Sequence, residues 1–311
     1  MDRIGNVNYF AQTGTGSVPK VAVVILNWNN YRDTRECLTS LEQLDHAEYG
    51  VIVVDNGSTD GSATRLEDEF AQHEFIRNRK NLGFAAGSNV GIRYALKRGA
   101  DYVLLLNNDA TVSPNLVTEM LKIAEEDPKT GLIGGRIYRY GTDEIHHAGG
   151  KVVTWGATAR SFRGQEGAYV DVRNVGFIIG CLMLIRAKMI EQIGLLDENY
   201  FFGGEDVEYC WRARKAGWDI KVNPKAEIWH KVSASAGGEG SPFLFYHSTR
   251  NRLYFAQELE VQDRIAFYIF FVFSRLARLF QWRLSGKDEL IVATLSGVRD
   301  FFRGETGNGS H

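Results

Sequence analysis

The sequence predicts an α/β fold in which helices cover both faces of a mostly parallel sheet and a helical extension follows at the C-terminus. Three observations predict it. Buried apolar strands alternate with helical patterns through about residue 126. Short strand-like segments rich in Gly, Val and Ile follow at 131–185, and an aromatic, basic stretch begins near residue 242. The 311 residues suffice for one large α/β domain with an appendage, or for two domains.

The first part of the chain alternates strands with helices in order. Strands are expected at 21–27, at 51–55, in a short segment around Phe75 and Ile76, and at 102–106. Helices are expected near 33–44, 61–72 and 85–97, and after Pro114. Short connections between such elements favour a parallel, doubly wound sheet.

The second part of the chain has a different sequence pattern. Segments such as KVVTWGATARSF suggest antiparallel strands or loops attached to the sheet. Helices are expected near 187–193 and 206–216. We find no internal repeat or long linker, so both parts are expected to form one continuous domain.

Composition excludes some classes of function. A net charge of −2 gives no sign of nucleic-acid binding, because a basic face would normally show in the total. The three cysteines, Cys37, Cys181 and Cys210, form no C-x-x-C pair, which favours a reduced, cytoplasmic setting. The first residues lack the apolar core of a secretory signal.

Polar loops follow three of the predicted strands. They read NWNN (27–30), DNGSTDGS (55–62) and NNDA (107–110). Taken alone, NNDA is a strand-to-helix turn, because Asn and Asp favour turns. Loops on alternating strand–helix units nevertheless converge at one edge of a parallel sheet, where ligands bind. Carboxylates, amides and backbone N–H groups at that edge suit a nucleotide.

Five segments in order, VVILNWNNYRDTRECLTSL, VIVVDNGSTDGS, NLGFAAGSNVGI, LLLNNDA and GGEDVEYCWRARKAGW, resemble the motifs of family 2 glycosyltransferases. The resemblance covers about residues 20–255. It implies an inverting enzyme with the GT-A (Rossmann-like) fold. NLGFAAGSN together with NND is most similar to the rhamnosyltransferase-like branch.

The resemblance implies which residues contact the nucleotide sugar. Asp55 would contact the base. For the glycines, the alternative to ligand contact is a role in turns and packing. Arg250 would reach the diphosphate, with solvent or membrane contact as the alternative. The full set is Asn27, Trp28, Asp55, Asn56, Gly57, Asn81, Gly83, Asn89, Asn107, Asn108 and Arg250.

NND aligns with the metal-binding D-x-D motif of the family, but here only Asp109 is anionic. Asn107 offers at most a neutral carbonyl, so the phosphates of the donor would have to complete the coordination of Mg2+ or Mn2+. His230 matches a histidine that completes the metal site in several relatives. The alternative is a structural histidine packed near Trp229.

The loop GGED supplies the candidate general base, either Glu205 or Asp206. The resemblance favours Asp206 narrowly, and N-terminal capping of the following helix is the competing role. Gly180 and Cys181 match the segment that shapes the acceptor site, although their apolar surroundings also fit a buried strand.

These assignments divide the chain. We expect a polar leader at 1–19, a GT-A domain at 20–240 with nucleotide-sugar (20–126) and acceptor (127–240) halves, a helical extension at 241–304 and a disordered tail at 305–311. The apolar stretch 265–273 is too short to span a bilayer. With Arg264, Arg275 and Arg278 on one side, the extension is expected to lie on the cytoplasmic face of the plasma membrane, or to pack on the main domain or a homodimer partner.

The expected function is metal-dependent, inverting transfer of a sugar from a dTDP- or UDP-sugar, with L-rhamnose from dTDP-rhamnose favoured. The acceptor would be a cell-surface glycan or a polyprenyl-linked saccharide. One alternative is a nucleotidyltransferase making nucleotide sugars, although NWNNYRD lacks its glycine-rich phosphate loop. The other is a catalytically silent binding protein that has lost metal binding.

Overall fold

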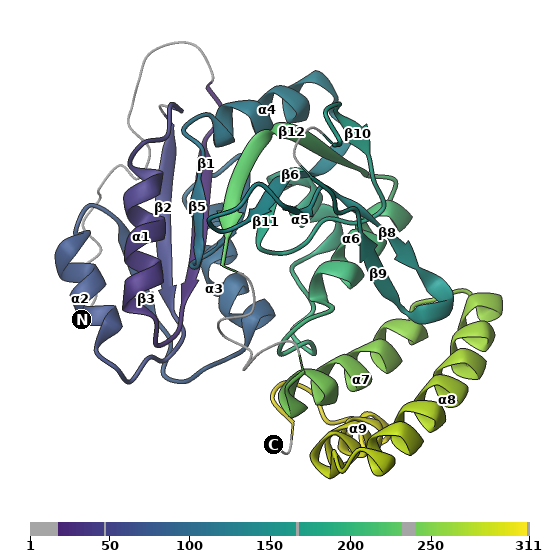
Figure 1. Cartoon of the computed structure of the whole chain (residues 1–311). Helices are drawn as coiled ribbons and strands as arrows, with labels where there is room; N and C mark the ends of the chain where they lie inside the picture. The colour runs from purple at the N-terminus through teal and green to yellow at the C-terminus, as the bar shows by residue number, and fades with distance from the viewer. Residues whose placement is uncertain (1–17, 47, 166–167, 232–239, 310–311) are drawn as a thin grey trace.

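The computed structural model describes residues 18–46, 48–165, 168–231 and 240–309. One mixed sheet runs through the described residues (Figure 1). Its strands lie in the order β10 (Arg173–Asn174), β12 (Asp219–His230), β6 (Thr130–Arg139), β11 (Leu182–Arg186), β4 (Tyr102–Asn107), β1 (Val21–Asn27), β2 (Tyr49–Asp55) and β3 (Glu74–Arg77). In addition, β5 (Ala110–Val112) pairs with β12 and β7 (Ile145–His147) pairs with β6. A separate hairpin joins β8 (Gly150–Val153) and β9 (Thr158–Ser161).

Successive strand residues point to opposite faces of the sheet, and the core divides accordingly. Val21 and Val23 of β1 pack with α1 (Tyr31–Leu41), α2 (Ser62–Glu69) and α4 (Leu116–Glu126). Ala22 and Val24 pack on the other face with α3 (Phe84–Lys97), α5 (Ala187–Ile193) and α6 (Glu205–Lys215). The predicted sheet with helices on both faces is therefore confirmed, and the helices lie within a few residues of their expected positions.

The parallel half of the sheet brings the ends of the predicted strands to one edge. β1 pairs in parallel with β2 on one side and β4 on the other. Asn27 lies opposite Asp55, and Leu26 lies opposite Asn107. The three polar loops thus leave the sheet at one edge.

The other half mixes strand directions. β11 is antiparallel to both β4 and β6, as expected for the segment 131–185. β12 was not predicted, because Pro224 and several charged residues hide its pattern. It runs parallel to β6 with a register shift between Asn223 and Glu227. Its last residue, His230, pairs with Ala110 of β5, next to Asp109.

Three helices form the C-terminal part: α7 (Pro242–Gln257), α8 (Val261–Leu284) and α9 (Asp288–Phe302). α8 lies beside the hairpin of β8 and β9 (Figure 1) and contacts its 3-10 turn η1 (Thr154–Gly156). The ring centroids of Trp155 and Phe270 are 4.7 Å apart there. Within the described residues, α8 is the helix whose length and composition would allow it to cross a membrane. It is longer than the stretch 265–273 that the sequence marked.

The chain ends differ from expectation in one respect. The tail was predicted to be disordered, yet the Glu305 carbonyl accepts a hydrogen bond from the Tyr254 hydroxyl (2.9 Å), and Gly307 bridges to Tyr200. The Tyr254 side chain of α7 and the backbone of the loop before α6 therefore position residues 305–309, while 310–311 lie outside the described residues. So does most of the predicted leader, residues 1–17.

Candidate functional site

The Asn27 side chain joins the strand ends and is fully buried. Its Nδ2 donates to Asp55 Oδ1 (2.9 Å) and to the hydroxyl of Ser62 (3.1 Å). Its Oδ1 accepts from the hydroxyl of Thr34 on α1 (2.9 Å). One amide thus joins β1, β2, α1 and α2 at the edge where the polar loops converge.

Asp55 faces the same network and has 3% of its surface exposed. Its two oxygens accept from Asn27 and from the backbone N–H of Ser58 (3.1 Å). Both residues were predicted to contact the nucleotide, and here both are engaged inside the protein. Trp28, the residue after Asn27, is 44% exposed instead.

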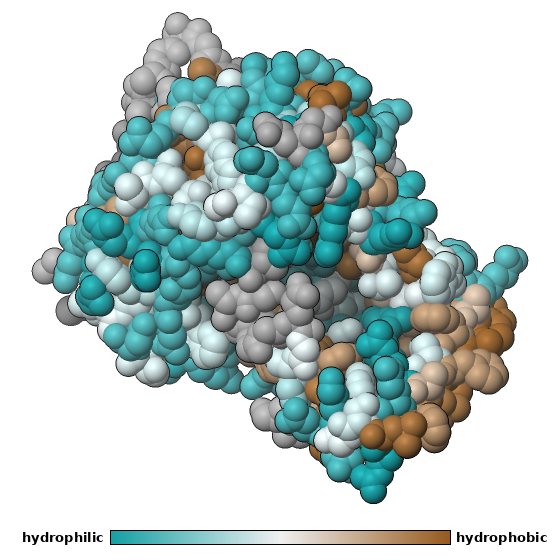
Figure 2. Space-filling view, in the orientation of Figure 1, coloured by the Kyte–Doolittle hydropathy of each residue, from teal (hydrophilic) through white to brown (hydrophobic). Residues whose placement is uncertain are grey.

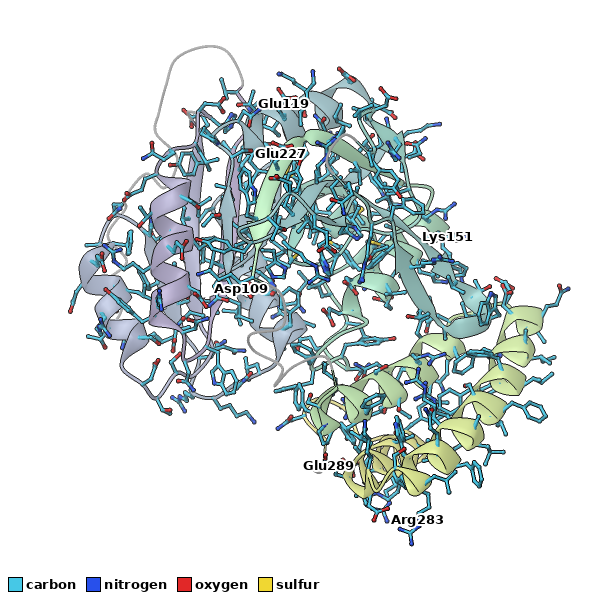
Figure 3. All side chains as sticks on the ribbon, in the orientation of Figure 1. Asp109, Glu119, Lys151, Glu227, Arg283 and Glu289 are labelled. Carbon is cyan, nitrogen blue, oxygen red and sulfur yellow. The ribbon has the colours of Figure 1, made fainter. Side chains whose placement is uncertain are left out.

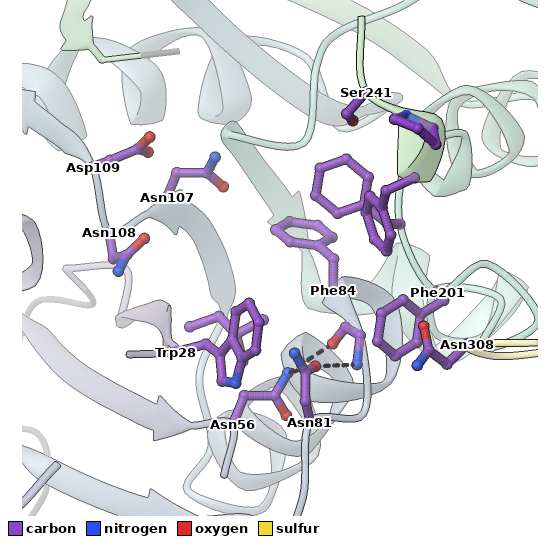
Figure 4. A pocket seen from close by; sticks show the side chains of 15 residues that line it. Trp28, Asn56, Asn81, Phe84, Asn107, Asn108, Asp109, Phe201, Ser241 and Asn308 are labelled. Carbon is purple, nitrogen blue, oxygen red and sulfur yellow. Dashed lines mark hydrogen bonds between the residues drawn. The ribbon is translucent and has the colours of Figure 1, made fainter. Parts of the chain in front are cut away.

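A cavity of about 560 Å3 opens beside these loops (Figure 4). It brings together many residues that the sequence singled out: Trp28, Asn56, Asn81, Gly83, Asn107, Asn108 and Asp109. Trp28, Asn56 and Asn81 lie toward one end of it, and Asn107, Asn108 and Asp109 toward another (Figure 4).

Asn56 organises the first end of the cavity. Its Nδ2 donates to Asn81 Oδ1 (3.0 Å) and to the carbonyl of Gly83 (3.1 Å). Gly83 has a φ of 84°, and a Cβ there would lie 2.4 Å from the Phe201 carbonyl oxygen, so no other residue fits. Gly57, beside Asn56, also has a positive φ, of 77°.

Aromatic residues that the sequence analysis missed line the opposite wall: Phe84, Phe201, Phe202 and Phe243, with Ser241 and Asn308 beside them. Phe84 directly follows the NLG motif, and Phe201 and Phe202 precede the GGED loop. Aromatic residues next to glycine-rich loops were the sequence signal that could have identified this wall, because such loops bring side chains to a ligand-binding surface.

Asp109 and His230 form the polar corner. His230 Nε2 lies 2.9 Å from Asp109 Oδ1 and 3.2 Å from Asn107 Nδ2. Both residues are almost fully buried (Figure 3 labels Asp109). Burial works to lower the pKa of His230, but Cys181 and Asp109 outweigh it and raise that pKa to about 10.

The donor set of this corner fits a divalent cation in part. Among the described residues, no well-aligned hydrogen bond reaches Asp109 Oδ1, and one cation could contact both it and His230 Nε2, since such bonds are about 2.0–2.2 Å long. The described residues contain no group of three His, Cys, Asp or Glu side chains that could hold a metal. Oxygen atoms of a bound ligand would have to supply the remaining coordination.

Two adjacent acids open α6. Asp206 accepts from the backbone N–H groups of Gly180 (3.1 Å) and Val207 (2.8 Å). Gly180 also touches Phe84 of the cavity wall, because a Cβ on Gly180 would lie 3.3 Å from that ring. Glu205 and Asp206 therefore lie behind the aromatic wall of the cavity, next to Gly180, which was predicted to contact the acceptor.

Glu205 is 6% exposed, and its Oε2 has no hydrogen-bond partner among the described residues. Burial, and then the neighbouring charge of Asp206, raise the pKa of Glu205 to about 8. Burial also raises the pKa of Asp206, but backbone N–H groups oppose that rise. The pair is thus arranged to keep a proton on Glu205 and the negative charge on Asp206.

Asn89, Arg250 and Cys181 are among the predicted site residues that do not line the cavity. Asn89 is fully buried, and its amide bonds the backbone of Leu196 (2.9 and 3.2 Å), which ties α3 to the loop after α5. Arg250 is fully buried on α7, where it donates to the Tyr246 hydroxyl (3.0 Å) and to a carbonyl of the tail. Cys181 lies in the core beside His230.

Comparison with known proteins agrees with this geometry. A model of the family described as Glycosyl transferase family 2 matches residues 22–194. A Mycobacterium tuberculosis N-acetylglucosaminyl-diphospho-decaprenol L-rhamnosyltransferase is 26% identical over 241 residues, which is 70% of this chain and 78% of that protein. The uncharacterised protein y4gI of Sinorhizobium fredii is also 26% identical, over 72% of this chain, but the match spans only 26% of its length.

The structure of GalNAc-T7 with UDP, GalNAc and Mn2+ has a similar fold, with a TM-score of 0.66 and 15% identity. The match covers 82% of this chain and 50% of that one. It confirms the fold that the sequence motifs implied.

The Asn27 network makes a prediction about stability. Asn27→Ala leaves Asp55 Oδ1 buried without its amide donor, so we expect the free energy of unfolding to fall by about 2–4 kcal/mol in chemical denaturation. Asn115→Ala is a matched control, because Asn115 precedes α4 without a side-chain capping bond. Equal stability of the two variants would refute the structural role of Asn27.

Glu205 makes a prediction about pH. Because its pKa is higher in the folded chain (about 8) than the ordinary value of 4.5, folding is favoured at low pH and this contribution is lost as the pH rises from 4.5 to about 8. Glu205→Gln stays neutral throughout. Its melting temperature should therefore fall less over this range than that of the wild type, and should be the higher of the two at pH 8.

The exposed Glu191 of α5 offers a control. Glu191→Gln should reproduce the wild-type pH profile. If Glu205→Gln also reproduces it, Glu205 is not the titrating group.

Proposed function

Because the chain belongs to glycosyltransferase family 2, we propose that it transfers a sugar from a nucleotide-sugar donor to an acceptor hydroxyl with inversion. The observation that carries the proposal is the cavity of about 560 Å3, which has an amide-rich end, an Asp109–His230 corner and a buried acid pair behind its aromatic wall. These are the three parts that displacement at an anomeric carbon needs. The family 2 and GT-A expectations from the sequence motifs agree with the comparisons.

The donor would lie with its nucleoside at the amide-rich end. Trp28 presents an exposed ring for the base, while Asn56 and Asn81 are fixed by their mutual hydrogen bond. Asn27 and Asp55 would not contact the donor and would instead hold the surrounding loops in place through their hydrogen bonds. We propose dTDP-L-rhamnose as the donor, and the relative's name supports the L-rhamnosyl part of this proposal.

The diphosphate would lie at the opposite end. Asp109 and His230 would hold a divalent metal there, as Mn2+ accompanies UDP in the similar GalNAc-T7 structure. When bound, the metal would stabilise the negative charge of the departing nucleoside diphosphate. The raised pKa of His230 means that a metal must displace a proton from its ring, so the binding would weaken as the pH falls.

The acceptor hydroxyl would be deprotonated by Asp206. Two backbone N–H groups orient this carboxylate, and the proton on Glu205 leaves Asp206 as the charged member of the pair. The proton would pass from the acceptor hydroxyl to Asp206 as that oxygen attacks the sugar. We propose a lipid-linked saccharide as acceptor, as the relative's name again suggests.

A panel of nucleotide sugars, measured by thermal shift with and without Mn2+, tests the donor assignment. We expect dTDP-L-rhamnose with Mn2+ to raise the melting temperature most, and the nucleotidyltransferase alternative predicts stabilisation by a nucleoside triphosphate instead. Donor binding without turnover on any acceptor would favour the silent binding protein.

Asp109→Ala should abolish the Mn2+-dependent part of the donor-induced thermal shift, because it removes the one carboxylate that the described residues place beside His230. The exposed Asp143 provides a control, and Asp143→Ala should keep the full shift. An unchanged Mn2+ response in Asp109→Ala would reject the metal site.

Asp206→Asn should lower the rate of sugar transfer about 10²–10⁴-fold while the donor-induced thermal shift persists, because a general base acts only in the chemical step. Glu205→Gln should retain most of the transfer rate. The reverse result would assign the base to Glu205.

A further inference from the structure

Three arginines gather where α7 meets α8, outside the site described above. The Arg252 guanidinium of α7 lies 5.8 Å and 5.9 Å from the ring centroids of Phe267 and Phe271. Arg275 of α8 lies 5.2 Å from the same Phe271 ring. One turn further along α8, Arg278 lies 6.0 Å from the ring of Phe245. Aromatic rings thus contact all three guanidinium groups along the line where α7 and α8 meet.

The cluster has no counter-anion in the part of the chain that the structure describes, where no carboxylate forms an ion pair with any of the three. Arg252 Nε donates to the Gly156 carbonyl (2.7 Å), whereas the buried Arg275 Nε has no hydrogen-bond partner. Burial, and then their mutual repulsion, lower the pKa values of Arg252 and Arg275 to about 10. Partly buried cations without a partner cost stability, so the arrangement favours an anion.

The position of the arginine cluster indicates which kind of anion it binds. Arg252 lines a second cavity of about 210 Å3, together with Gly203, Gly204 and Val207. These residues flank Glu205 and Asp206 in the sequence. Phe202 lines both this cavity and the larger one. An anion held by Arg252 would therefore lie beside the acid pair, on the side where an acceptor must approach.

The outer side of α8 is apolar. Phe267, Phe271 and Trp282 face inward, while aliphatic and aromatic side chains face solvent: Ile265, Ile269, Val272, Phe273, Leu276 and Phe280. Figure 2 shows this apolar surface over α8 at the edge of the molecule. A helix that carries Arg275 and Arg278 against aromatic rings of α8 and α7, and an apolar outer side, is suited to lie in a membrane interface rather than to cross the bilayer.

We propose that Arg252, Arg275 and Arg278 bind the phosphate groups of a lipid-linked acceptor, whose hydrocarbon chain enters a bilayer contacted by the outer side of α8. The inference rests on the proposed function and names the acceptor's chemical class from this chain's own residues. A diphosphate matches the cluster in charge, and guanidinium groups bind phosphate oxygens through paired hydrogen bonds. The phosphate would hold the saccharide end of the lipid at the acid pair.

Vesicle co-sedimentation of the full chain tests the proposal. The vesicles are phosphatidylcholine alone, phosphatidylcholine with phosphatidylglycerol, and phosphatidylcholine with a polyprenyl diphosphate at matched surface charge. The wild type should bind the polyprenyl diphosphate vesicles most tightly. The double variant Arg252→Gln/Arg275→Gln should lose this preference, by roughly tenfold in affinity, and keep its weaker binding to phosphatidylcholine.

Arg283→Gln is the matched control. Arg283 lies on α8 but pairs with Asp288 (2.9 Å) away from the cluster, and Figure 3 labels it at the far end of the helix. Its loss removes one cation from the same helix, and it should leave the preference intact. Because Arg278 is exposed, Arg278→Gln supplies a second variant that should fold normally and weaken the preference.

The outcomes separate the alternatives. Equal wild-type binding to phosphatidylglycerol and polyprenyl diphosphate overturns the proposal in favour of general anionic headgroups, and an unchanged preference in both cluster variants overturns it outright. Co-sedimentation measures lipid binding without requiring sugar transfer. Failure of the proposed function would appear as absent donor binding in the thermal-shift panel, whereas failure of this inference leaves donor binding intact.

Discussion

The buried amide of Asn27 is the constraint on which the candidate site depends. It links the ends of β1 and β2 to the first turns of α1 and α2 through hydrogen bonds that water cannot replace in so closed a place. Because Asn27 points inward, the next side chain, Trp28, is directed to the cavity. The loops at the strand ends are thereby held in one arrangement before any ligand arrives.

A second constraint joins the two halves of the sheet. Gly83 admits the carbonyl of Phe201 so closely that a side chain is excluded, and the backbone N–H of Phe84 donates to that carbonyl (2.8 Å). The segment before α6 is therefore fixed against the start of α3. This contact sets the acid pair of α6 at a defined place relative to the cavity.

Buried groups with incomplete partners mark the places where a ligand would complete the structure. Within the described residues, Asp109 pairs with His230 and Glu205 keeps a proton, yet each has a carboxyl oxygen with no well-aligned hydrogen bond, and Arg252, Arg275 and Arg278 pair with no carboxylate. Folding alone would select against such groups, because a buried polar atom without a hydrogen bond costs about 1–3 kcal/mol and a buried charge without a partner costs more. Their retention is consistent with a donor metal, an acceptor hydroxyl and a lipid phosphate as the missing partners.

The sequence by itself determined the parallel half of the sheet, since apolar strands followed by polar loops admit few other arrangements. Through the resemblance of its motifs to family 2 glycosyltransferases, it also singled out Asn56, Asn81, Gly83 and the NND segment as ligand contacts, and these residues line the cavity. The resemblance implied that His230 could complete a metal site with Asp109, and the tertiary structure placed the two side by side through the pairing of β12 with β5. Only the tertiary structure turned Asn89 and Arg250 into the interior and brought Arg252 of α7 together with the arginines of α8. These outcomes depend on which elements pack together over more than a hundred residues of chain or across two helices, and local sequence patterns carry no such information.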